Sequence, residues 1–240
     1  MTACAAAPLV IAASQIGESH QASGAPCQDA YAWAEVRRGL FVIAVADGLG
    51  TAPRSDDGAA IVVEAAVNSA ITACATGPAR DDLPGLVRHS ACAARAALEA
   101  DAHELGVPLS DLASTLVLVA VSGSSVCAAQ VGDSGVVAET GEGLTLVTGP
   151  DHGEYVNDVI PLTARSWLDA FRVSPVLDAV RAVAVFTDGC ERAALRRETS
   201  PPRDLVPHEG FFGPLFFVWL GASLDLRDLG LALLKPREPQ

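Results

Sequence analysis

The chain has 240 residues, of which 50% are hydrophobic, and this is enough to bury a substantial core. Its formal net charge of −13 disfavours nucleic acid and anionic membrane surfaces as partners, because both are bound by clustered lysine and arginine. Six scattered cysteines without a Cys-x-x-Cys pair favour a reducing compartment and argue against a zinc site.

Neither end of the chain carries a targeting or membrane-spanning pattern. Met1–Val10 lacks the basic region of a signal peptide, and Pro8–Ala13 is typical of a first strand. Near the other end, Phe211–Leu224 is apolar but too short to cross a bilayer. We therefore expect a cytoplasmic protein that forms a single domain over residues 1–240.

One buried strand and two long helices are predicted in the first half of the chain. Leu40–Ala46 is a continuous apolar run that ends at Asp47-Gly48, as in a strand buried on both faces. A helix is predicted from about Asp56 to Cys74, with Ser55 or Asp56 as its N-cap. A second helix is predicted from about Leu83 to Leu105.

The second half is rich in short apolar runs separated by Gly/Ser turns, which predict hairpins of an antiparallel sheet. The runs are Ser114–Val121, Ser125–Val131, Gly135–Glu139 and Leu144–Thr148. A later run, Ala182–Phe186, ends at Thr187-Asp188-Gly189, and helical segments are expected after it. Strand–helix–strand units are too few for a doubly wound parallel sheet, so we expect an α+β fold with helices outside stacked sheets.

Two aspartates stand at the ends of apolar runs, each followed by glycine. Asp47-Gly48 and Asp188-Gly189 place a carboxylate where a strand fixes it and solvent reaches it. Two such strand ends could converge on a hard cation, which prefers oxygen ligands. Either pair alone is more often an ordinary turn. Gln28-Asp29 before a strand and Gly132-Asp133-Ser134 after one favour the interpretation as a metal site.

The order of these motifs resembles that of bacterial protein phosphatase 2C-like enzymes, over roughly residues 9 to 195. The resemblance rests on eight short motifs: Gly17–His20, Pro26–Ala30, Val45–Gly50, Ser55–Ala59, Ser114-Thr115, Gly132–Ser134, Gly153–Asn157 and Phe186–Gly189. It implies a four-layer αββα sandwich with two central, mainly antiparallel sheets. It also implies a binuclear Mn²⁺ or Mg²⁺ centre at one edge of the sandwich.

The resemblance also implies a role for each acidic motif in holding two ions and a weaker third. Asp47 corresponds to the carboxylate that bridges the two metals, and Gly48 offers its backbone carbonyl to one of them. Asp188 corresponds to a terminal ligand of the other metal. Asp29 supports the metal-bound waters, and Asp133 matches the position of the weaker third ion.

The mechanism implied by the resemblance is hydrolysis of phosphoserine or phosphothreonine in proteins by a metal-activated water. His20 falls near the position where relatives place an arginine that grips the substrate phosphate, so it would bind phosphate or protonate the leaving oxygen. A surface histidine without such a role is an equally good interpretation. The implied partners are a phosphorylated protein and a bacterial Ser/Thr kinase or its targets.

The chain departs from the family pattern near its C-terminus. Relatives close with an Asp-Asp pair leading into a last strand, and one of these carboxylates completes the metal site. Here Asp225 and Asp228 are the nearest acids, at the start of a Leu-rich segment that we expect to be helical. We therefore expect the closing strand to be missing, Phe211–Leu234 or another subunit to cover the open sheet edge, and metal affinity to be weak.

Two further interpretations stay open beside the active protein phosphatase. The first is a pseudophosphatase that binds a phosphoprotein or another partner without efficient turnover, which the missing Asp-Asp pair favours. The second is a hydrolase of small phosphoesters, because a metal centre does not by itself select the substrate.

Overall fold

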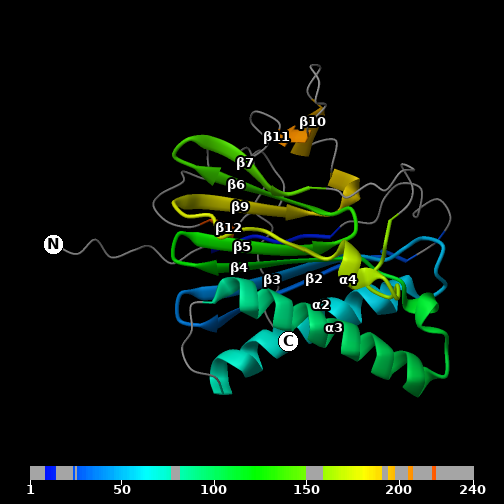
Figure 1. Ribbon diagram of the computed structural model, residues 1–240. Helices are drawn as coiled ribbons and strands as arrows, with labels where there is room; N and C mark the ends of the chain where they lie inside the picture. The colour runs from blue at the N-terminus through cyan, green and yellow to red at the C-terminus, as the bar shows by residue number, and fades with distance from the viewer. Residues whose placement is uncertain are drawn as a thin grey trace, which may run out of the picture.

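The computed structural model describes residues 9–14, 24, 26–76, 82–149, 159–190, 194–197, 205–207 and 218–219. Two five-stranded sheets, each antiparallel throughout, stack face to face in these residues (Figure 1). The first sheet has the order β2-β3-β4-β5-β8 and the second has the order β1-β12-β9-β6-β7.

The strands of the first sheet are β2 (Asp29–Arg37), β3 (Leu40–Asp47), β4 (Leu116–Ser122), β5 (Ser125–Val131) and β8 (Arg172–Val173). Those of the second sheet are β1 (Leu9–Val10), β6 (Gly135–Thr140), β7 (Gly143–Thr148), β9 (Val180–Phe186) and β12 (Val218–Trp219). The predicted hairpins of the second half are therefore confirmed. They are divided between the two sheets, because β4 and β5 pair in the first sheet and β6 and β7 in the second.

Two long helices cover the outer face of the first sheet (Figure 1). They are α2 (Ser55–Thr76) and α3 (Leu83–Leu105), so both predicted helices are confirmed. Asp82 caps α3 by accepting a hydrogen bond from the Gly85 N–H at 2.9 Å. Gly106 ends it in the left-handed conformation, with φ of 67°. Short helical turns lie elsewhere: η1 (Leu109–Leu112), α4 (Trp167–Ala170) and η2 (Asp188–Cys190).

A small hairpin, not a helix, packs on the outer face of the second sheet in the described residues. It consists of β10 (Leu195–Arg197) and β11 (Leu205–Pro207), and Leu195 contacts the outer apolar cluster around Val137 and Phe186. Of the helical segments expected after Asp188-Gly189, the described residues contain the three-residue turn η2 and a helical residue at Ala194. The α+β class with two stacked antiparallel sheets and outer helices is confirmed.

A C-terminal strand is present in the second sheet, where we expected none. β12 pairs with β1 on one side and with β9 on the other, and it comes from the Phe211–Leu234 segment that we expected to cover this edge. The expectation of a missing strand was wrong because no acidic pair precedes this apolar run, so its sequence does not resemble the closing strand of the family. The expectation that Phe211–Leu234 covers the edge is confirmed at Val218–Trp219. Asp225 and Asp228 lie outside the described residues.

Strand β3 is buried on both faces because it lies between the helices and the other sheet. Leu40, Val42 and Ala44 belong to the core under α2 and α3. Phe41 and Ile43 belong to the core between the two sheets. This alternation explains the continuous apolar run that the sequence shows before Asp47.

Helix α2 is long and apolar enough to cross a membrane, but its buried side chains pack inside the protein. Val62, Ala66 and Ala70 are fully buried in the core between α2, α3 and the first sheet. The apolar composition of α2 is therefore that of a core helix.

Gly58 lets α2 lie directly against η1, and replacing it should be costly. A Cβ atom at this position would overlap the carbonyl oxygen of Leu112. We expect Gly58→Ala to lower the free energy of unfolding by about 2–3 kcal/mol, although alanine favours helix more than glycine does. Urea unfolding followed by circular dichroism measures this, and Gly141→Ala, in an open turn, is the matched control. Equal unfolding midpoints for the two variants would contradict the packing argument.

Candidate metal centre

Asp29 and Asp47 lie side by side at one end of the first sheet. Asp29 opens β2 and Asp47 closes β3, and the register of the two strands places these residues directly opposite each other. Directly opposed residues on antiparallel strands project to the same face of the sheet. Just beyond them, the Gly48 N–H donates to the Gln28 carbonyl at 3.0 Å, so the pairing continues past the strand ends.

Thr115, the residue before β4, fixes the backbone of Asp47 from the other side. The Thr115 N–H donates to the Asp47 carbonyl at 2.8 Å, and the Asp47 N–H donates to Thr115 Oγ1 at 3.0 Å. Thr115 is only 1% exposed, so water does not compete for these bonds. The Asp47 side chain therefore projects from a backbone that is held on both of its polar groups.

Glycine at position 48 is required by the close approach of the start of α2. A Cβ atom there would lie 2.5 Å from the Ser55 carbonyl oxygen, which no real side chain tolerates. Gln28 strengthens the same contact, because its Nε2 donates to the buried Ser55 Oγ at 2.6 Å. The starts of β2 and α2 are thus tied together beside Asp47.

Asp133 and Asp188 approach from loops that follow β5 and β9. Asp133 is half-buried and comes directly after Gly132, whose φ of 106° favours glycine. Asp188 is exposed and opens η2. Burial raises the pKa of the Cys190 thiol, and the charges of Asp29 and Asp188 raise it further. Cys190 therefore lies near an acid of each sheet, Asp29 of β2 and Asp188 after β9.

The four aspartates lie within electrostatic reach of one another. In the absence of metal ions the pKa of Asp47 is raised from 3.8 to about 8. Burial is the largest cause, and the negative charges of Asp29, Asp188 and Asp133 and a hydrogen bond with Asp188 contribute in the same direction. This end of the sandwich therefore concentrates more negative charge than it can hold in ionised form without a cation.

The donor chemistry fits Mg²⁺ or Mn²⁺, which prefer carboxylate, carbonyl and water oxygens. Within the ranges that the structure describes, no group of three His, Cys, Asp or Glu side chains is arranged to hold one ion. Mg²⁺ commonly keeps several waters and takes only one or two protein carboxylates. The donor chemistry of the cluster fits a hydrated ion of this kind, which Asp47 and its neighbours could hold.

Several residues named from the sequence fall outside the described part of the chain. These are His20, the Gly153–Asn157 motif, and Asp225 and Asp228. Conversely, Thr115 and the bond between Gln28 and Ser55 are functional features that the motifs do not predict, beyond the place of Thr115 in the Ser114-Thr115 motif. A threonine directly before the apolar run of β4 was the available signal, since a buried polar side chain next to a strand end needs a partner.

Comparison with known proteins assigns the chain to a family. The sequence profile described as protein phosphatase 2C matches residues 16–225. The chain belongs to the protein phosphatase 2C family. "Serine/threonine-protein phosphatase 3" of Escherichia coli (strain K12) is 32% identical over 231 residues, covering 94% of this chain and 88% of that protein.

Solved structures share the fold of the protein phosphatase 2C family at lower identity. PppA of Pseudomonas aeruginosa, described as a key regulatory component of T6SS, has a TM-score of 0.57 at 22% identity. The match covers 79% of this chain and 81% of PppA. The serine/threonine phosphatase of S. agalactiae has a TM-score of 0.53 at 18% identity, covering 78% and 80% of the two chains.

The raised pKa of Asp47 has a consequence for stability without metal. Between about pH 4 and pH 8 the unfolded chain releases the Asp47 proton while the folded chain keeps it, so folding stability falls as pH rises through this window. Asp47→Asn removes this loss and should stabilise the metal-free protein, by on the order of 2 kcal/mol at pH 8 after allowance for solvent screening.

Melting temperatures in EDTA from pH 5 to pH 8 measure the effect. We expect the advantage of Asp47→Asn over the wild type to grow with pH up to about 8. Glu64→Gln, which removes an exposed carboxylate on α2, is the control for a simple change in net charge. A destabilised Asp47→Asn protein at pH 8 would contradict the crowding of charge at this end of the sandwich.

Proposed function

We propose that the chain hydrolyses phosphoserine and phosphothreonine in proteins and that it depends on Mn²⁺ or Mg²⁺. The observation that carries the proposal is the convergence on Asp47 of three further acids, Asp29, Asp133 and Asp188, from separate strand ends and loops. Holding carboxylates together costs stability, and a bound cation offsets that cost. The 32% identity to a named serine/threonine-protein phosphatase supports the same reaction.

We assign Asp47 and Asp188 as direct ligands of two ions, with the Gly48 carbonyl beside them. In this assignment Asp29 orients bound water, and Asp133 holds a weaker third ion. When bound, the ions lower the pKa of water and neutralise charge on the phosphoryl oxygens. Each assigned residue lies in a strand or within two residues of one, which fixes ligand positions better than a free loop does.

The residues around the ligands serve to keep Asp47 in place. Thr115 holds its backbone through two hydrogen bonds, and the Gln28–Ser55 bond holds the neighbouring strand and helix. The proton that Asp47 carries in the metal-free protein has to leave when a cation binds. Cation binding is therefore expected to be stronger at higher pH, and proton release should accompany it.

The substrate that we propose is a phosphoprotein, and the proposed partner is a bacterial Ser/Thr kinase or its targets.

A pseudophosphatase is the second candidate function. It is favoured by the arrangement of the described acids, in which no three side chains form one ion site, and by the absence of an Asp-Asp pair before the final apolar segment. Turnover in the presence of excess metal separates the two candidates.

A phosphothreonine peptide assay tests the proposed reaction. We expect release of phosphate with added Mn²⁺, none in EDTA, and a loss of at least about a thousandfold in rate for Asp47→Asn, equal to ~4 kcal/mol of barrier. The melting temperature shows that the variant is folded, and Glu64→Gln should keep wild-type rates. Metal-bound wild-type protein that fails to turn over would support the pseudophosphatase, and full activity in EDTA would exclude this mechanism.

Asp133→Ala tests whether Asp133 holds a third, more weakly bound ion. If Asp133 holds a third ion, the variant should turn over about tenfold or more slowly and need a higher Mn²⁺ concentration for half-maximal rate. Calorimetric titration with Mn²⁺ should still detect the remaining sites. An unchanged rate together with an unchanged Mn²⁺ titration would return Asp133 to the role of a turn residue after β5.

A further inference from the structure

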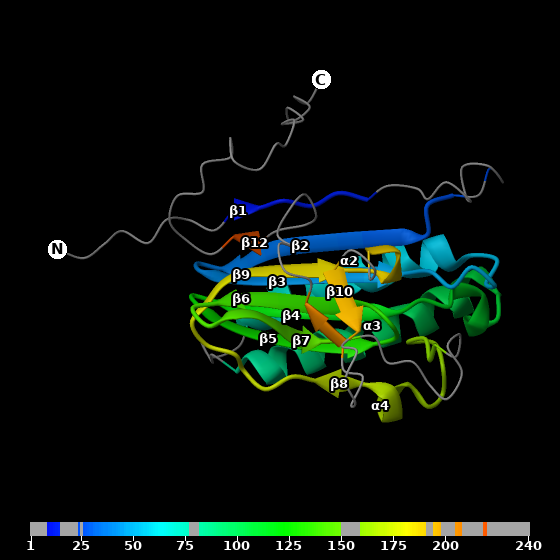
Figure 2. The ribbon, with the colours of Figure 1, turned by 90° about the horizontal axis from the view of Figure 1, so that it is seen from above.

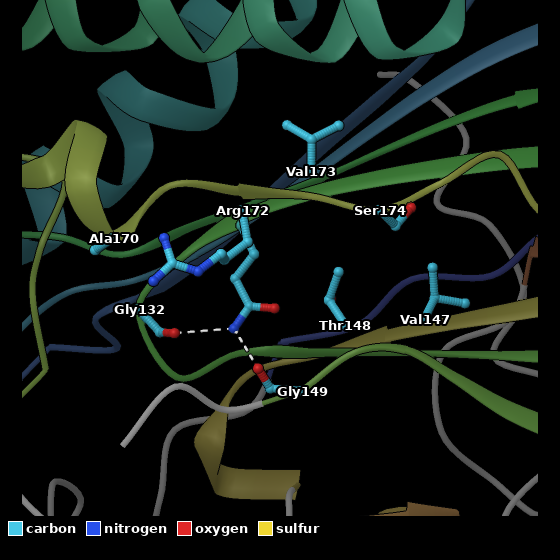
Figure 3. Close-up of a pocket in the computed structure, with 9 residues that line it drawn as sticks. Gly132, Val147, Thr148, Gly149, Ala170, Arg172, Val173 and Ser174 are labelled. Atoms are coloured by element: carbon cyan, nitrogen blue, oxygen red, sulfur yellow. Dashed lines mark hydrogen bonds between the residues drawn. The ribbon is translucent and has the colours of Figure 1, made fainter. Parts of the chain in front are cut away.

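A half-open pocket lies beside the edge strands β7 and β8 (Figure 3). Figure 2 shows β8 at one edge of the first sheet and β2, which begins with Asp29, at the other. Its volume is about 360 Å³, at the lower end of the range for small-molecule sites. Gln130 of β5, Thr148 of β7 and Arg172 of β8 supply its functional groups, and Val147 and Val173 are among its apolar walls.

Gln130 is a polar residue on the face of β5 whose other residues are apolar. Val126 and Ala128, on the same face of β5, pack in the core between the sheets, and Gln130 is itself only 3% exposed. Its Nε2 donates to the carbonyls of Gly132 at 2.9 Å and Gly149 at 2.8 Å (Figure 3). Its Oε1 is buried and has no hydrogen-bond partner among the described residues.

A second polar atom of the pocket, Oγ1 of Thr148, is also buried without a hydrogen-bond partner among the described residues. Buried polar atoms are nearly always paired, with protein, water or a ligand. Two such atoms lining one cavity therefore indicate a site for a molecule that carries hydrogen-bond donors.

Arg172 adds a positive charge at the exposed side of the pocket. It is directly paired with Gln130 across β5 and β8, so both side chains project to the same face of the first sheet. Figure 3 shows its side chain extending toward Ala170 and Gly132. Its Nη1 donates to the Asp169 carbonyl at 2.5 Å, which anchors the guanidinium there. A guanidinium is well suited to bind carboxylate or phosphate oxygens.

We propose that this pocket binds a compact organic anion, whose charged group pairs with Arg172 and whose hydroxyl or amine bonds to Gln130 Oε1 and Thr148 Oγ1. The deep end of the pocket selects the donor group and the exposed end selects the charge. Nothing in this proposal requires phosphatase activity, so it stands or falls separately from the proposed function.

The pocket also contacts the loop that carries Asp133. Gln130 holds the Gly132 carbonyl, and Gly132 lies so close to Thr115 that a Cβ atom would be 2.5 Å from Thr115 Cγ2. Thr115 in turn bonds Asp47. Gln130 is therefore connected to Asp47 through two packed residues, Gly132 and Thr115.

Titration of the full ¹⁵N-labelled chain, freed of metal ions on a chelating resin, tests the site, because bound metal ions would be competing anion acceptors. The probes are L-malate and L-glutamate, which are carboxylates with a hydroxyl or an amine, and 2-aminoethylphosphonate, which carries a phosphorus anion. We expect saturable shifts of the Gly132 and Gly149 amide resonances with at least one probe, at millimolar concentration or below. Whether the carboxylates or the phosphonate bind identifies the anion class.

Two substitutions locate the binding. Thr148→Val should weaken the probe about fivefold, without lowering the melting temperature because the hydroxyl has no partner to lose, and Arg172→Gln should weaken it about tenfold. The matched controls are Thr145→Val, on the exposed side of β7, and Arg181→Gln, an exposed arginine of β9. The proposal is overturned if no probe shifts these amides, or if the controls weaken binding as much as the pocket variants do.

Discussion

Repulsion between carboxylates held at one end of the two sheets is the constraint that the rest of the structure has to withstand. Opposed side chains on antiparallel strands are about 5 Å apart, and two charges at that distance repel by about 3 kcal/mol at an effective dielectric constant of 20. Asp29 and Asp47 stand in this relation, and Asp133 and Asp188 add to it. In a flexible loop such residues would simply move apart.

The fold prevents this movement because the strands that present the acids run through its core. β3 is packed against the helices on one face and against the second sheet on the other, so Asp47 cannot retreat without unpacking both. Thr115, Gly48 and Ser55 then hold its backbone through hydrogen bonds and a contact that admits no side chain. Rigidity of this kind costs stability in the metal-free protein and prepares the site for a cation.

The negative charge of the chain and of the aspartate cluster also affects substrate binding. A chain of net charge −13 repels a phosphoprotein, and four aspartates at the site repel a phosphoryl group most of all. In the proposed function, divalent ions both relieve the strain among the aspartates and reverse the sign of the local charge. Metal binding and substrate binding are thus linked by the same electrostatics.

The sequence by itself determined the local elements and the types of ligand. The apolar run of β3 and the spacing of α2 and α3 predicted these elements closely, because burial imposes its periodicity on each segment separately. The order of the acidic motifs gave the family. Tertiary structure alone decided that β12 joins the second sheet and that Thr115 holds Asp47. It also decided that Gln130 Oε1 and Thr148 Oγ1 line one pocket, with no hydrogen-bond partner for either atom among the described residues. These features join residues far apart in the chain, and no local pattern of hydrophobicity or turn chemistry records which distant partner a strand or a side chain will meet.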